Sequence, residues 1–222
     1  PSLVRNVSSV PYAGAALIRW APPVSSGGAA VSYSVEYSVV GSDVWVEASG
    51  CEALSVTACR VLGFSEWGSA HIVRVQASNV SGASASVSSR EFIPYTVSDS
   101  GAFAEQVSVQ PGNAQLDISW SGVDWSSYDR GAPAKWVHVR AINPDSGASR
   151  QCYIRVPAED GICSIVGLKN GDAHRVEIRL YNLALWSEWT TVSVAAEKVT
   201  PVSVAPSLVR NVSSVPYAGA AL

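Results

Sequence analysis

The chain has 222 residues, of which 47% are hydrophobic and 15% charged, and its formal net charge is −3. The hydrophobic fraction excludes a disordered chain, no run approaches the roughly 18 apolar residues of a membrane span, and the acidic balance argues against nucleic acid as a partner. Because charged residues make up about a quarter of an ordinary soluble domain, this surface is unusually neutral. We therefore expect the protein to pack against copies of itself.

Short alternating runs with turn residues between them predict β-strands along the first half of the chain. They cover 5–10, 15–20, 31–38, 44–48, 55–61, 71–78 and 83–89. A second series covers 105–109, 115–120, 135–142, 150–156, 162–166, 174–181 and 190–196. No stretch shows helical periodicity. The pattern predicts an all-β fold of two antiparallel, seven-stranded sandwiches. We name them module 1 (1–96) and module 2 (105–199), with 97–104 as a linker.

Two kinds of internal repeat are present. Residues 206–222 repeat residues 1–17 letter for letter, and the offset from Pro1 to Pro206 is 205 residues. A weaker repeat of about half that period relates Trp20 to Trp120. We therefore expect a repeating unit of two diverged modules, with 200–222 starting the next copy of module 1. Because the chain opens at Pro1 and holds no Met, we also expect a fragment or a processed chain.

The duplicated segment is expected to bury its apolar side chains as the first strand and the start of the second, and to form the seam between repeats. The residues are Leu3, Val7, Val10 and Leu17 in the first copy and Leu208, Val212, Val215 and Leu222 in the second. A covalent tandem array, in which the second copy opens the next module, is the favoured interpretation. Insertion of this strand into a neighbouring chain and an engineered origin remain alternatives.

Four cysteines form two local pairs, Cys51 with Cys59 and Cys152 with Cys163. None lies in a CxxC motif and no His cluster accompanies them, so we expect neither zinc nor any other metal or cofactor. The spacing favours two disulfides, which are typical of an extracellular or cell-surface location. Free buried thiols are the alternative.

Several runs resemble fibronectin type III modules. In module 1, LIRWAPP (17–23), YSVEYS (33–38) and HIVRVQASNVSGAS (71–84) are similar to strands B, C and F–G. Module 2 carries LDISW (116–120), VHVRA (137–141), GLKNGDAHRVEIRLYN (167–182) and WSEWTTVSV (186–194). The resemblance implies an immunoglobulin-like sandwich. Where the family usually has Tyr at the start of strand F, this chain has His71 and His174, which we expect to point inward and hold the preceding loop.

A cation–aromatic ladder is predicted on the outer face of module 2, because side chains of one face recur at every second residue of a strand. Its expected members are Trp136, Arg140, Arg175, Arg179, Trp186 and Trp189. The segment WSEW (186–189) is similar to the WSxWS box of type I cytokine receptors, whose tryptophans interleave with strand-F arginines. The alternative is that these tryptophans fill the module junction.

Modification motifs occur at four positions. Asn6, Asn79 and Asn211 fit the N-x-[ST] sequon, and W-x-x-W makes Trp186 a candidate for C-mannosylation in a eukaryote. Chance occurrence in a Ser-rich chain is the alternative for the sequons. No GxSxG, HExxH, P-loop or GxGxxG is present, so an enzyme is not expected.

The sequence therefore favours a structural subunit of an extracellular filament, stalk or sheath, with copies of itself as partners. The alternative is a receptor or adhesin ectodomain that binds a protein ligand, although the cysteine pattern of the cytokine-receptor first module is absent. An accessory module of a bacterial enzyme is a more distant third.

Overall fold

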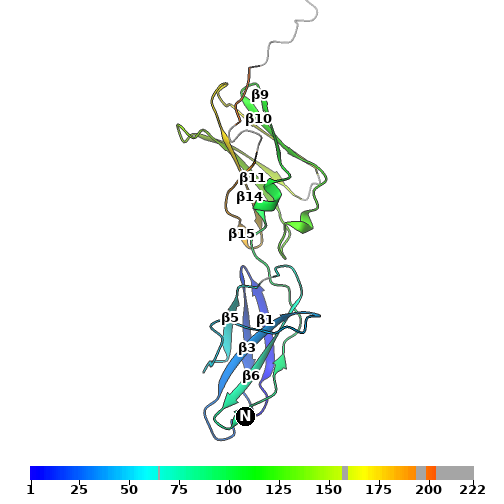
Figure 1. The fold of residues 1–222 in the computed structure, drawn as a ribbon, viewed down its shortest axis with the longest axis vertical. Helices are drawn as coiled ribbons and strands as arrows, with labels where there is room; N and C mark the ends of the chain where they lie inside the picture. The colour runs from blue at the N-terminus through cyan, green and yellow to red at the C-terminus, as the bar shows by residue number, and fades with distance from the viewer. Residues whose placement is uncertain (65, 157–159, 194–198, 204–222) are drawn as a thin grey trace, which may run out of the picture.

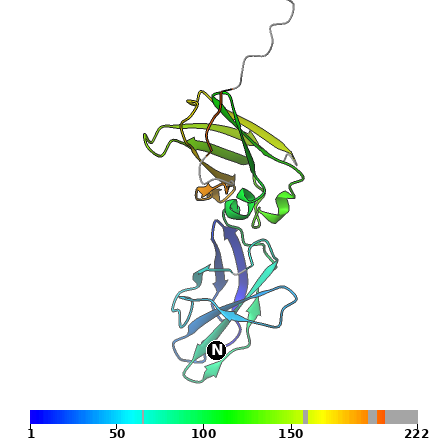
Figure 2. The same cartoon turned by 45° about the horizontal axis from the view of Figure 1, so that its top comes forward.

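A computed structural model describes residues 1–64, 66–156, 160–193 and 199–203. Within them, two β-sandwiches follow one another end to end, and the turned view shows the same elongated arrangement (Figures 1 and 2). No helix in these ranges is long and apolar enough to cross a membrane.

Module 1 consists of two antiparallel sheets. One has the order β1-β2-β5 and contains β1 (Arg5–Tyr12), β2 (Ala15–Ala21) and β5 (Ala58–Leu62). The other has the order β4-β3-β6-β7, with β8 also pairing with β6. Its strands are β3 (Ser32–Val39), β4 (Val46–Glu47), β6 (His71–Asn79), β7 (Gly82–Ala83) and β8 (Val87–Ser88).

Module 2 repeats this plan. The sheet β13-β10-β9 contains β9 (Ser108–Gly112), β10 (Gln115–Trp120) and β13 (Gly161–Val166). The facing sheet β12-β11-β14-β15 contains β11 (Trp136–Ile142), β12 (Ser149–Arg155), β14 (Arg175–Asn182), β15 (Leu185–Trp186) and, paired with β14, β16 (Thr190–Thr191). Each module is therefore a sandwich of two antiparallel sheets. The all-β fold expected from the sequence is thus confirmed.

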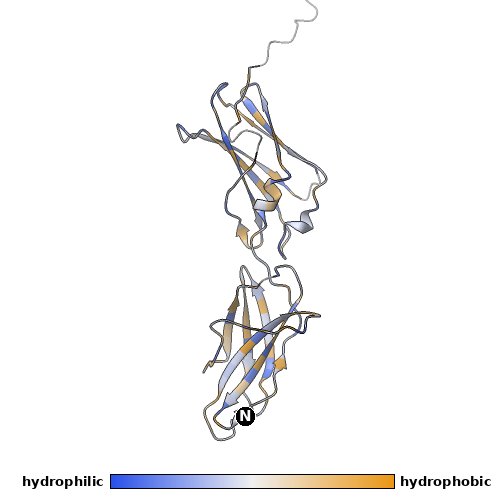
Figure 3. Cartoon of the chain, in the orientation of Figure 1, coloured by the Kyte–Doolittle hydropathy of each residue, from blue (hydrophilic) through white to orange (hydrophobic). Residues whose placement is uncertain are grey.

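Each core lies between the two sheets of its own module and is filled by every second residue of the facing strands. Figure 3 shows the resulting alternation of apolar and polar residues along the strands. In module 1, Ile18 on β2 and Val35 on β3 belong to the same core cluster, and both are fully buried. Trp20 and Trp120 lie at equivalent places, with 5% and 4% of their surfaces exposed. The period of two therefore determines both interiors.

The face expected for Leu17 is wrong. Ala16, Ile18 and Trp20 all point into the core. Because strand side chains alternate, Leu17 must point outward with Arg19. Its partner on β1 is Val10, which is 54% exposed.

The exposure of Val10 and Leu3 also contradicts the seam prediction, whereas the position of Val7 agrees with it. Leu3 is 49% exposed, and Val4 takes the buried position instead. Val7 is half-buried and packs against the core next to an irregularity in β1. The second copy (Leu208, Val212, Val215 and Leu222) lies outside the described residues.

A short helix, α1 (Ser100–Ala104), occupies the segment expected to be a linker. Asp99 caps it by accepting a hydrogen bond from the backbone N–H of Ala102 at 3.1 Å. Phe103 and Ala104 are buried in the core of module 2, where the Phe103 ring lies 5.4 Å from that of Trp120. Residues 100–104 therefore pack as part of module 2. A single 3₁₀ turn, η1 (Trp125–Ser127), lies in the loop after β10.

Candidate functional site

The connection between the modules is bound to module 1 by backbone hydrogen bonds. The N–H of Gly68, in the loop before β6, donates to the carbonyl of Pro94 at 3.1 Å. The N–H of Gly14, between β1 and β2, donates to Tyr95 at 2.9 Å. Two loops of module 1 thus hold successive residues of the connection.

Module 2 binds the next residues of the connection. The N–H of Thr96 donates to Arg130 at 3.1 Å, and the carbonyl of Thr96 accepts from the Asn182 amide at 2.8 Å. Asn182 is fully buried at the end of β14. Its amide nitrogen also donates to the carbonyls of Asp129 and Ala132. One side chain therefore fixes both the connection and the loop that receives it.

Two glycines meet where the loops of the two modules touch. Gly68 and Gly131 both have positive φ, +88° and +87°. A Cβ atom on Gly68 would lie 3.1 Å from the backbone nitrogen of Gly131. Only glycine combines this backbone conformation with so close an approach.

The module 1 half of this junction recurs at the far end of module 2. The N–H of Gly171 donates to the carbonyl of Pro201 at 3.0 Å, as Gly68 does to Pro94. Three residues after each glycine comes a histidine whose backbone pairs with the segment leaving the module. His71 pairs with Phe92 in module 1, and His174 pairs with Val199 in module 2. The chain therefore leaves both modules in the same way.

The module 2 half recurs at the near end of module 1. Asn79 ends β6 as Asn182 ends β14, and its amide donates to the carbonyl of Ser26 at 2.6 Å. The N–H of Ser2 donates to Ser25 at 2.9 Å, as that of Asp99 does to Tyr128. Gly28 has φ +81°, and no atom lies within 4 Å of a Cβ placed on it. This end resembles the receiving side of the junction.

The two strand-F histidines lie as the sequence predicts. His71 is fully buried and His174 is 5% exposed. The Nδ1 atoms lie 2.8 Å from the carbonyl of Ser69 and 2.9 Å from that of Asp172. Each imidazole N–H can thus donate to the loop before its strand. These are the loops that carry Gly68 and Gly171.

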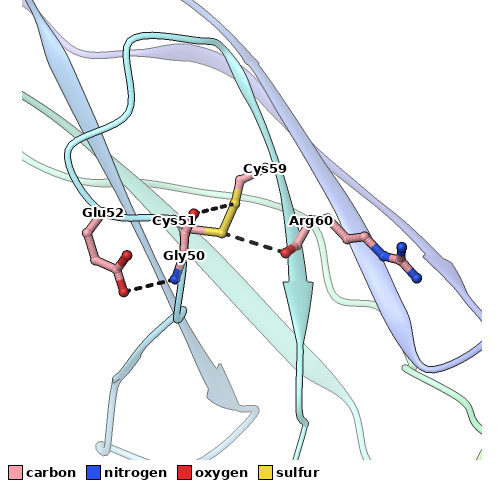
Figure 4. Close-up of a disulfide and its surroundings, with 5 residues drawn as sticks. All are labelled: Gly50, Cys51, Glu52, Cys59 and Arg60. Atoms are coloured by element: carbon pink, nitrogen blue, oxygen red, sulfur yellow. Dashed lines mark hydrogen bonds between the residues drawn. A yellow bond between two sulfur atoms is a disulfide. The ribbon is translucent and has the colours of Figure 1, made fainter.

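Two disulfides join Cys51 to Cys59 and Cys152 to Cys163, the pairs that the sequence indicates. The Cα atoms are 5.8 Å apart in the first and 6.3 Å apart in the second. Figure 4 shows Cys51 in its loop and Cys59 on β5. In module 2 the bond links β12 to β13, which belong to different sheets. Both disulfides therefore connect the two layers of a sandwich along an edge.

The outer face of β14 carries stacked guanidinium and indole groups. The guanidinium carbon of Arg179 lies 4.5 Å from the ring centre of Trp186 and 4.3 Å from that of Trp189. Arg140 lies 3.9 Å from the Trp189 ring. We call these four residues the ladder. Each contact is within the range of a cation–π interaction.

Two residues expected in the ladder have other surroundings. Arg175 donates to Glu177 at 2.8 Å, and Trp136 is 40% exposed at the start of β11. Among the residues that the structure describes, no cation–ring contact includes either of them. Arg175 instead joins the ion pair that the buried Glu177 forms with Arg140.

His138 also belongs to this cluster, although it is not among the residues expected in the ladder. It is 2% exposed, and its ring stacks on Tyr153 with 4.0 Å between centres. Its Nδ1 accepts from Arg179 at 3.2 Å while Nε2 lies 3.0 Å from the Gln151 oxygen. Burial lowers the pKa of His138, the hydrogen bond to Gln151 opposes this, and the positive charges of Arg179 and Arg140 lower the pKa further. The neutral ring suits this arrangement.

Equivalent positions of the two modules carry ion pairs of opposite polarity. In module 1, Glu36 on β3 lies opposite Arg74 on β6, at 2.6 Å. In module 2, Arg140 on β11 lies opposite Glu177 on β14, also at 2.6 Å. Both pairs link the central strands of the larger sheet.

The sequons differ in their surroundings. Asn6 is exposed and has a positive φ of 52°. Asn79 is half-buried, and besides the bond to Ser26 its side-chain oxygen Oδ1 accepts from the N–H of Ser81 at 2.9 Å. Trp186 lies in the ladder, and Asn211 lies outside the described residues.

A cavity of about 200 Å³ in module 2 is lined by residues that include Asp172 and His174. Two of its charged lining residues pair with each other, since Asp172 contacts Lys169 at 3.3 Å, and Asp172 also accepts from Asn143 at 3.3 Å. In the described part of the chain, no group of three His, Cys, Asp or Glu residues could hold a metal ion.

No protein-family model matches the chain, and no curated protein matches it. Among solved structures, the chicken interferon gamma receptor alpha chain is similar over 90% of this chain and 98% of that chain, with 14% identity and a TM-score of 0.40. The FN1-FN3 domains of chicken CNTN1 are similar over 90% of this chain and 67% of that chain, with 16% identity and a TM-score of 0.38. What this chain does is therefore inferred from its own contacts and repeats.

Proposed function

We propose that this chain is a segment of an extracellular structural protein, a filament, stalk or sheath, in which paired fibronectin type III-like modules repeat in tandem and stack end to end. The observation that carries the proposal is the recurrence of the junction contacts at both outer ends. Gly171 and Pro201 provide an exit like that of module 1. Asn79 and Gly28 provide a receiving end like that of module 2.

At the receiving end of module 1, the side-chain amide of Asn79 has one N–H left to donate. An amide nitrogen carries two protons, and Asn79 Nδ2 uses one on Ser26. In the existing junction, Asn182 binds the equivalent loop carbonyl and also Thr96 of the connection. We infer that Asn79 binds, in the same way, a carbonyl of the segment that precedes a copy of Pro1.

The letter-for-letter repeat supplies that copy. Pro206 starts the second occurrence of the first seventeen residues, soon after the anchored Pro201. The same backbone contacts would then recur at every junction, which supports a rod of regular spacing. The two disulfides are typical of oxidising, extracellular surroundings.

The test is the mass of the native protein after reduction and denaturation. We expect a very large species or a series of regularly spaced masses, because in a tandem array the two-module unit recurs along one chain. A single species near the 23.3 kDa of this chain contradicts the tandem array. Strand exchange between separate chains would then be the better explanation.

A receptor or adhesin ectodomain is the second candidate, favoured by the ladder that the WSEW segment forms with Arg179 and Arg140. The full-length coding sequence of the native protein separates the two functions. A native chain with one pair of modules and a membrane span supports the receptor, and many tandem copies support the filament.

A further inference from the structure

The outer face of the β1-β2-β5 sheet in module 1 carries exposed apolar side chains. Val10 and Leu62 are each 54% exposed. Leu17 lies between their strands, opposite Val10 on one side and Arg60 on the other. We call this surface the basic face.

The name reflects its charge. The three strands contain Arg5, Arg19 and Arg60, and no Asp or Glu. Arg19 and Arg60 are both exposed and flank Leu17 on the same side of the sheet. Two basic faces would therefore repel each other.

The corresponding sheet of module 2 has the opposite charge. On its outer face, Ile162 is 70% exposed and Val166 is 60% exposed. Asp117 lies beside them on β10, opposite Ser164 of β13. The strands β9, β10 and β13 contain no Lys or Arg. We call this surface the acidic face.

We propose that the basic face of one copy of this chain docks on the acidic face of a second copy, so that neighbouring copies pack side by side with module 1 against module 2. Apolar side chains on both faces leave water on contact. The Asp117 carboxylate, which already accepts from Gln115 and Ser164, has lone pairs left for a guanidinium. Like charges oppose the pairing of two basic faces or of two acidic faces, which favours the pairing of module 1 with module 2.

Such a contact is weak by itself. Strands lie about 4.8 Å apart, so a three-stranded face covers far less than the roughly 800 Å² per partner of a standard interface. Repetition along an array multiplies weak contacts into a strong one. The contact does not require that repeats be covalently joined, so it stands or falls separately from the tandem array.

The experiment follows amide chemical shifts of the 222-residue chain in a dilution series from micromolar to millimolar. We expect concentration-dependent shifts on both faces and nowhere else. Arg19→Glu and Asp117→Lys should each abolish them. An equimolar mixture of the two variants should restore them, because the unaltered acidic face of the Arg19→Glu chain then meets the unaltered basic face of the Asp117→Lys chain, and the introduced Glu meets the introduced Lys.

Arg90→Glu and Asp43→Lys make the same charge changes at exposed positions outside both faces, and should leave the shifts unchanged. Retained amide dispersion in every variant shows that each still folds. The proposal is overturned if the unaltered chain shows no shifts at millimolar concentration, if both charge variants still associate, or if the mixture fails to recover association.

Discussion

The backbones of Gly68 and Gly131 touch across the module junction, with a Cβ on Gly131 placed 3.1 Å from the Cα of Gly68 and 2.5 Å from the carbonyl oxygen of Pro94. Neither residue has a side chain that could separate the two backbones. The relative position of the two modules therefore depends on two residues that lack side chains.

Gly131→Ala should loosen the junction. The new methyl group would collide with Pro94, and alanine at φ +87° adds about 1 kcal/mol or more of backbone strain. We expect small-angle X-ray scattering to show a broader distribution of distances between the modules. Gly147→Ala is the matched control, since Gly147 has φ +71° but no atom within 4 Å of its Cβ position. An equal broadening in both variants would contradict the prediction.

Removing the Cys152–Cys163 disulfide should destabilise module 2 alone. Its sequence separation is 11 residues, and closing a loop of this size stabilises a domain by about 2–3 kcal/mol through the unfolded chain. The double variant Cys152→Ala, Cys163→Ala should lower the free energy of unfolding of module 2 by that amount. Hydrogen exchange in urea can measure each module separately. Equal losses in module 1 would show that the two modules unfold as one unit.

Arg179→Ala should disorder the ladder. The guanidinium contacts both Trp186 and Trp189 and donates to His138. We expect the free energy of unfolding of module 2 to fall by about 1–2 kcal/mol, with a weaker near-ultraviolet circular dichroism signal from the tryptophans. Arg155→Ala is the control, because Arg155 is an exposed arginine at the end of β12. The prediction fails if the two variants behave alike.

His138 should make module 2 less stable in mild acid. Its pKa in the folded state is lowered, by burial first, so the unfolded state binds the proton more readily. The free energy of unfolding therefore rises with pH between the lowered pKa and the ordinary value of about 6.5. The contribution of His138 is fully present above the ordinary value and is lost below the lowered pKa. His138→Phe should flatten this part of the curve of unfolding free energy against pH. An unchanged slope would assign the dependence to other groups.

Strand order and position follow closely from the sequence, because Pro and Gly separate runs whose period is two. The inward face of β2 was harder to assign, since Leu17 and Ile18 are both apolar and either could be buried. The buried position of Trp20 settles it, because residues two apart on a strand share a face and Ile18 therefore lies inside with it. The five residues of α1 were missed because a helix of little more than one turn has no measurable periodicity.

The candidate site was less accessible to sequence reasoning. The ladder followed from alternation along β14, but the pairing of Arg175 with Glu177 required knowing which acid is buried. The junction gave almost no signal, since its contacts are backbone hydrogen bonds between residues far apart in the chain. Asn79 and Asn182, at the ends of equivalent strands, were the one available indication.

The opposite polarity of the Glu36–Arg74 and Arg140–Glu177 pairs bears on the fidelity of folding. Neighbouring modules of similar sequence are prone to exchange strands while they fold. If β3 paired with β14, Glu36 would face Glu177, and if β11 paired with β6, Arg140 would face Arg74. Like charges directly opposite each other destabilise a sheet. Each central strand thus rejects the partner strand of the adjoining module and accepts its own.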